Sequence, residues 1–91
     1  MERYLIEVPH EPEKYACNRA IEIFLKSGSH FLSHADWGCH DGEHKAWITV
    51  EVNSKEEARS ILPPAFREQA KITTVNRYNL KDMEDALKYH D

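Results

Sequence analysis

The chain lacks long apolar runs and basic blocks, and these absences exclude two classes of function. No stretch approaches the ~18–20 apolar residues that a membrane-spanning helix needs. Lys and Arg number 12 against 16 Asp and Glu, and the basic residues are scattered among the acids. Because no basic patch is present to release counterions from phosphates, we expect no nucleic-acid partner and no membrane partner.

Cysteine is also scarce, with Cys17 and Cys39 as the two copies in the chain. They lack the C-x-x-C spacing of redox and zinc-ribbon motifs. The first residues, "MERYLIEVPHEPE", lack the apolar core of a signal peptide. We therefore expect a cytoplasmic protein in which both cysteines are free thiols.

The length of 91 residues predicts a single domain over residues 1–91. A chain of this size buries only about 60–65% of the surface that its unfolded form exposes. Pairing with a second copy would therefore add materially to its stability.

Hydrophobic periodicity predicts an α+β fold. Residues 3–8 read as a strand, and apolar side chains then recur at helical spacing between Pro12 and Gly28. The remaining expected elements are strands over 30–37 and 45–52, a capped helix over 54–62, a one-turn or irregular connector over 65–70, a strand over 71–78 and a helix over 80–90 begun by Asn79. We expect a core under the helices of Ile6, Val8, Cys17, Ile21, Phe24, Trp37, Ile48, Val50 and Val75.

A tight turn is predicted between the second and third strands. Asp41-Gly42 favours a type I′ turn, which needs positive φ at both central residues. This turn would pair Trp37 with Ala46 and Cys39 with His44, and side chains alternate between the two faces. Trp47 then lies on the face away from the helices, where a large apolar ring usually marks an interface.

With right-handed crossovers, this order of elements gives a ferredoxin-like βαββαβ fold. Its antiparallel sheet has the order 4-1-3-2, and the C-terminal helix is an addition. The element order and the run Gly28-Ser29-His30-Phe31 resemble the dimeric α+β barrel superfamily. That superfamily includes muconolactone isomerases, small cofactor-independent monooxygenases and small domains that bind metal. The resemblance implies a homodimer whose two sheets face each other.

Candidate functional residues gather between residues 29 and 48. Cys39, His44, His34 and Asp36 are potential metal ligands, because thiolate and imidazole suit zinc or nickel and a carboxylate can complete the set. The expected register places Cys39 opposite His44, and it places His34 and Asp36 on the other face. The alternative is a polar hairpin whose histidines bond to each other or to water. Cys17 is expected to be a buried core residue.

A small-molecule site is a further reading of the same hairpin, formed by His34, Asp36, Trp37 and Trp47. Three functions stay open at this point. The first is binding of a small ligand or a divalent metal. The others are a cofactor-independent isomerase or monooxygenase acting inside the barrel, and a structural or interaction module without a site.

Overall fold

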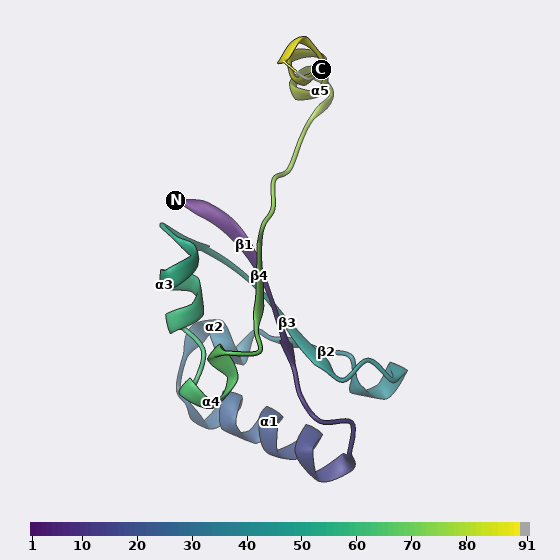
Figure 1. The fold of residues 1–91 in the computed structure, drawn as a ribbon, viewed down its shortest axis with the longest axis vertical. Helices are drawn as coiled ribbons and strands as arrows, with labels where there is room; N and C mark the ends of the chain where they lie inside the picture. The colour runs from purple at the N-terminus through teal and green to yellow at the C-terminus, as the bar shows by residue number, and fades with distance from the viewer. Residues whose placement is uncertain (90–91) are drawn as a thin grey trace.

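The computed structural model describes residues 1–89, and within that range the side chains of residues 1–84. It shows an α+β fold in which a four-stranded antiparallel sheet packs against helices (Figure 1). The elements in chain order are β1 Glu2–Pro9, α1 Lys14–Lys26, α2 His30–Ser33, β2 Asp36–Trp37, the 3-10 helix η1 Cys39–Asp41, β3 Lys45–Val52, α3 Lys55–Ser60, α4 Pro64–Arg67, β4 Lys71–Thr74 and α5 Leu80–Tyr89.

The sheet has the order β2-β3-β1-β4, which is the predicted order 4-1-3-2 counted from the other edge. The two central strands pair along their whole length, with Ile6 opposite Ile48 and Pro9 opposite Lys45. The α+β class and the sheet order are therefore confirmed. Membership of the ferredoxin-like group and a paired barrel stay predictions.

The core lies between the sheet and the helices α1 to α4. Alternate residues of β1 are buried, and the residues between them are half-buried. Six of the nine predicted core residues are buried: Ile6, Val8, Cys17, Phe24, Ile48 and Val50. Ile21, Trp37 and Val75 are half-buried.

The predicted strand over 30–37 is wrong for its first part, which forms the helix α2. Gly28, with φ of 76°, ends α1, and the Ser29 hydroxyl then caps α2 by accepting the N–H of Leu32 at 3.3 Å. In this helix Leu32 turns into the core and Phe31 is exposed, the reverse of the expected strand pattern. The glycine that ends α1 and the N-cap that begins α2 thus favour a helix over the strand that the apolar alternation predicts.

Two residues of the expected second strand keep the predicted register. Trp37 lies opposite Ala46, and Asp36 lies opposite Trp47. The pairing stops there, because Ala35 follows a helix rather than continuing a strand.

The predicted type I′ turn is also wrong. Asp41 belongs to the 3-10 helix η1, and Gly42 alone of these two residues has a positive φ, at 78°. The backbone N–H groups of Asp41 and Glu43 both donate to the carbonyl of Gly38 at 3.0 Å. The result is a wider loop over residues 38–44, which we call the tip loop.

The second half of the chain follows the expected helix signals. The Ser54 hydroxyl accepts the N–H of Glu57 at 3.1 Å and caps α3, and α4 is the predicted one-turn connector. Asn79 caps α5 through the N–H of Asp82 at 2.8 Å. The strand β4 ends at Thr74 rather than at the predicted residue 78.

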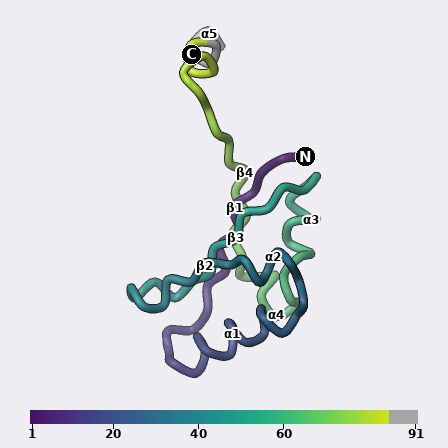
Figure 2. The backbone as a smooth tube through the Cα atoms, turned by 180° about the vertical axis from the view of Figure 1, so that it is seen from behind, coloured from purple at the N-terminus to yellow at the C-terminus, as the bar shows by residue number. Residues whose placement is uncertain are grey.

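The helix α5 stands away from the sheet at the end of an extended segment, as both views show (Figures 1 and 2). Its Leu80 and Met83 are exposed. Helical spacing from Leu80 and Met83 also predicts an apolar position at Leu87, which lies outside the described side chains, and the predicted helix end at residue 90 lies outside the described residues. Among the described helices, none is both long and apolar enough to cross a membrane.

Candidate metal centre

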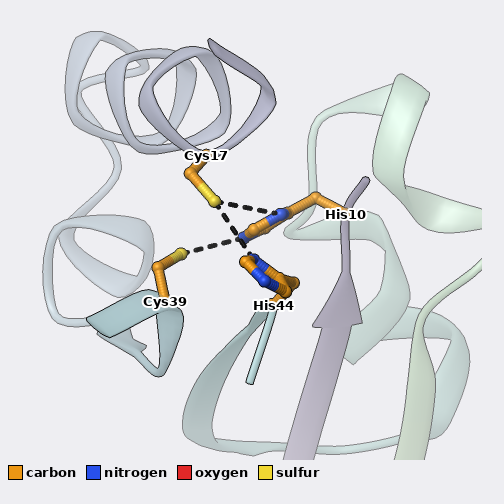
Figure 3. Close-up of side chains that lie close together, drawn as sticks. All are labelled: His10, Cys17, Cys39 and His44. Carbon is orange, nitrogen blue, oxygen red and sulfur yellow. Dashed lines mark hydrogen bonds between the residues drawn. The ribbon is translucent and has the colours of Figure 1, made fainter. Parts of the chain in front are cut away.

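Four side chains from four segments converge at one end of the sheet (Figure 3). His10 follows β1, Cys17 lies on α1, Cys39 lies on η1 and His44 precedes β3. We call these four residues the metal group. Each offers one donor atom, and the four donors all lie within 4.8 Å of one another. Metal–ligand bonds of about 2.0–2.3 Å place the donors of a tetrahedral zinc site about 3.3–3.8 Å apart. A modest contraction would therefore bring all four to one ion.

The sheet brings the two histidines together. Pro9 and Lys45 form the last pair of the β1–β3 ladder, and His10 and His44 follow directly beyond it. The backbone N–H of His10 donates to the carbonyl of His44 at 3.1 Å. Their ring centroids are 5.8 Å apart, with the rings edge to face. Both imidazoles are thus placed by backbone pairing.

The two cysteines approach from the helical side. Cys17 lies in the first turn of α1, where its N–H donates to the carbonyl of Glu13 at 3.1 Å, and it is 8% exposed. Cys39 is half-buried and is carried by the tip loop. Because α1 packs on the sheet, its first turn holds one sulfur over the end of β1.

Nitrogen and sulfur atoms alternate around the group. Cys39 Sγ lies 3.3 Å from His10 Nε2, and Cys17 Sγ lies 3.4 Å from His44 Nδ1. A longer contact of 3.8 Å joins Cys17 Sγ to His10 Nδ1. Each thiol therefore has an imidazole partner when no metal is bound. The donors face inward rather than toward solvent.

His10 also has the outer contact that metal-bound histidines commonly make. Its Nδ1 lies 3.1 Å from the carbonyl oxygen of Glu11. When Nδ1 carries the proton and donates it to this oxygen, Nε2 keeps its lone pair for a metal. That nitrogen is the one that points at Cys39.

The pKa of the Cys39 thiol is raised to about 11, chiefly by burial and next by the neighbouring Cys17 thiol. Cys39 is therefore a neutral thiol at neutral pH in the metal-free protein. A bound cation would displace its proton, because the thiolate is the metal ligand.

The structure brings together only part of the residue set expected from the sequence. Cys39 and His44 belong to the metal group, but His34 and Asp36 do not. His34 follows α2 and is exposed, with its Nδ1 2.7 Å from the carbonyl of His30. Its ring centroid is 4.4 Å from that of His30, whereas a strand would have separated the two by about 13 Å. Asp36 is exposed on β2.

The two tryptophans lie on opposite sides of the sheet. Trp37 packs edge to face on Phe24, with centroids 5.0 Å apart, and lies 5.9 Å from the His10 ring. It therefore separates the metal group from the core. Trp47 points to the other face, where its indole N–H donates to Glu7 at 3.3 Å.

Sequence reasoning missed His10 and assigned Cys17 to the core alone. Pairing of β1 with β3 would have identified His10, because a ladder that ends at Pro9 and Lys45 sets His10 beside His44. Cys17 is buried as expected, yet it lies at the end of the apolar stripe of α1 that faces the tip loop. The other donors reach Cys17 from the segment after β1 and from the tip loop, and the sequence pattern does not specify the path of either loop.

A groove of about 450 Å³ adjoins the metal group between α1 and α4. Its lining includes Pro9, Ala16, Ala20, Phe66 and the exposed Arg19. His10 belongs both to this lining and to the metal group. A movement of the His10 side chain at the metal group would therefore also change the lining of the groove.

None of the family models, curated proteins or solved structures compared with this chain matches it. Its function is therefore argued from the chemistry of the site.

Proposed function

We propose that this chain binds one divalent transition-metal ion, with zinc as the best fit, through His10, Cys17, Cys39 and His44. The observation that carries the proposal is the convergence of two sulfur and two nitrogen donors within 4.8 Å. Two thiolates and two imidazoles form a tetrahedral set that zinc favours. The two thiolates also neutralise the double positive charge of the ion.

The donor count favours binding over catalysis. A structural zinc site uses four protein ligands, whereas a catalytic one keeps a position open for water or substrate. Here four donors surround one point, and all four residues are at least half-buried in segments that pack together. We therefore assign the ion a structural or regulatory role. Nickel is the alternative ion, and it prefers square-planar or octahedral sets.

Metal binding would link segments from different parts of the chain. The ion would link α1, the segment after β1, and the tip loop. Because binding to the folded form alone stabilises that form, occupancy should couple directly to folding stability.

Titration with zinc against a competing chromophoric chelator tests the proposal. We expect about one zinc per chain in the parent protein and at least about 100-fold weaker binding in Cys17→Ser and Cys39→Ser. His40→Ala is the matched control, because His40 is exposed on the same tip loop outside the metal group. Cobalt in place of zinc should give the visible absorption of tetrahedral thiolate coordination. Equal, weak binding by parent and variants would refute the site.

We also propose that the chain forms a homodimer through the sheet face that carries Leu5 and Trp47. The helices α1 to α4 lie to one side of the sheet (Figures 1 and 2). Within residues 1–84, Leu5, Glu7 and Trp47 are half-buried on the opposite side. An apolar ring on such a face is typical of an interface, and a second copy is its commonest cover.

The free thiols are consistent with the expected cytoplasmic location.

A further inference from the structure

We propose that the metal group is a redox switch, in which a hydroperoxide joins Cys17 to Cys39 and expels the ion. This inference rests on the proposed metal site and adds its regulation. The two sulfurs are the only cysteine sulfurs of the chain, and they lie within 4.8 Å of each other.

The distance between the sulfurs is short enough for a disulfide bond. Since a disulfide places its sulfurs about 2.05 Å apart, at most about 2.7 Å must be closed. Cys17 is fixed on a thirteen-residue helix, whereas Cys39 lies on a three-residue turn. The tip loop can therefore supply the movement while the sheet and α1 stay in place.

Exposure gives the two sulfurs different roles. Cys17 is 8% exposed, and Cys39 is half-buried, so a peroxide from solvent reaches Cys39 first. Cys17 is then the nearest thiol able to resolve the oxidised sulfur. Its burial also keeps it from the cysteines of other chains, which favours a bond within the chain.

The chemistry balances with a hydroperoxide as the oxidant. The Cys39 sulfur attacks one peroxide oxygen, the O–O bond breaks, and a sulfenic acid and hydroxide (for hydrogen peroxide) are formed. The Cys17 sulfur then attacks the Cys39 sulfur, the S–O bond breaks and a second hydroxide leaves. Each sulfur has lost one electron to the peroxide, and two protons convert the hydroxides to water.

The disulfide would remove half of the donor set. Its sulfurs are neutral and no longer act as thiolate ligands, so His10 and His44 alone would remain. Two imidazoles do not complete a tetrahedral site, and the ion would leave. A thiol reductant would restore both sulfurs and renew binding.

The test uses the zinc-loaded full chain and hydrogen peroxide, with zinc content measured before the peroxide is added. We expect release of about one zinc per chain, a mass lower by about 2 Da and a peptide in which Cys17 is linked to Cys39. Reductant should reverse all three changes. Cys39→His is the matched variant, because it keeps four donors but cannot form the bond, and we expect it to retain zinc under the same treatment.

The outcomes separate the two proposals. A reduced protein that binds no zinc at the start refutes the metal site, and the switch with it. Zinc that is bound at the start and stays bound after peroxide, or a disulfide between two chains through Cys39, overturns the switch and leaves the metal site standing. Equal zinc release by the parent and Cys39→His also overturns it, because release would then not need the disulfide.

Discussion

The backbone N–H of His10 donates to the carbonyl of His44 at 3.1 Å, one step beyond the β1–β3 ladder. This bond places the two imidazoles independently of any ion, since it belongs to the sheet. The sulfur of Cys39 has no such support, because it is carried by the tip loop. The metal group therefore has three donors placed by the sheet and α1, and a fourth donor, Cys39, on a more adaptable loop.

Metal removal should lower the thermal stability of the protein. Because the ion would link α1, the tip loop and the end of β1, it stabilises only the folded form. A free zinc concentration about 1,000 times the Kd adds about 4 kcal/mol to the free energy of unfolding. Thermal unfolding followed by circular dichroism with zinc and with excess chelator measures the difference. Identical midpoints for the parent, with a normal shift in a known zinc protein run beside it, would contradict the prediction.

Zinc affinity should fall as the pH is lowered. The pKa of Cys39 is raised to about 11 in the metal-free protein, so its thiol carries a proton throughout the neutral range, and binding must release it. One released proton makes the affinity about tenfold weaker for each unit of pH decrease. Competition titrations between pH 6 and 8 in one buffer series check the slope, and a flat profile would exclude thiolate ligands.

Ile48→Ala should destabilise the fold by about 2–5 kcal/mol, because truncation leaves a cavity in the packed core. Ile48 is 3% exposed and lies opposite Ile6 at the centre of the sheet. Urea unfolding gives the change in the free energy of unfolding. Thr49→Ala is the neighbouring control, since Thr49 is exposed and should cost less. A loss below about 1 kcal/mol for Ile48→Ala would mean that this face of β3 is not packed.

Gly38→Ala should displace the tip loop and weaken zinc binding. A Cβ at this position would lie 2.7 Å from both the Glu43 carbonyl oxygen and the Trp47 ring, closer than real contacts allow. The loop that carries Cys39 must then shift. Gly42→Ala is the comparison, because its Cβ would meet no atom within 4 Å and its cost is limited to the strain of φ at 78°. Zinc titration should rank Gly38→Ala as the weaker binder, and the reverse order would contradict this account of the loop.

The parent protein should sediment at about twice its chain mass of 10.7 kDa at micromolar concentration. Trp47→Glu should yield monomers, because it places an unpaired charge at the proposed interface and beside Glu7. Circular dichroism checks that the variant is folded. Asn18→Glu, at an exposed position of α1, is the charge-matched control and should stay dimeric. A folded parent that sediments as a monomer would refute the dimer.

Period-two and helical patterns predicted the central strands, α1, α3 and the sheet order, because these elements bury one continuous face. The segment over 30–37 was harder to assign, since its apolar residues fit either structure. There the Ser29 cap favours the helix, and burial of Leu32 rather than Phe31 follows from it. A local sequence pattern alone does not show whether a capped helix or a paired strand is the more stable structure for such a segment.

Two of the four residues of the metal group were predicted from the sequence. Cys39 and His44 are close in sequence and lie in one loop, so both were assigned to the site although the predicted turn between them is wrong. His10 and Cys17 reach the same point through the β1–β3 register and the packing of α1, which are long-range features. Pattern reasoning treats each segment by itself, and a donor set assembled from four segments needs their relative placement.

The four donors fall into two local pairs that lie far apart along the chain. His10 and Cys17 are seven positions apart, and so belong to one end of the chain, whereas Cys39 and His44 both belong to the tip loop. Either pair alone offers an ion only two ligands, and the full set exists only after β1 has paired with β3 across the 35 residues between Pro9 and Lys45. Loop closure of that length is an entropic cost that must be met before the complete site can form. An ion held by all four donors would therefore be captured late in folding, and its binding would mark chains whose central sheet is already complete.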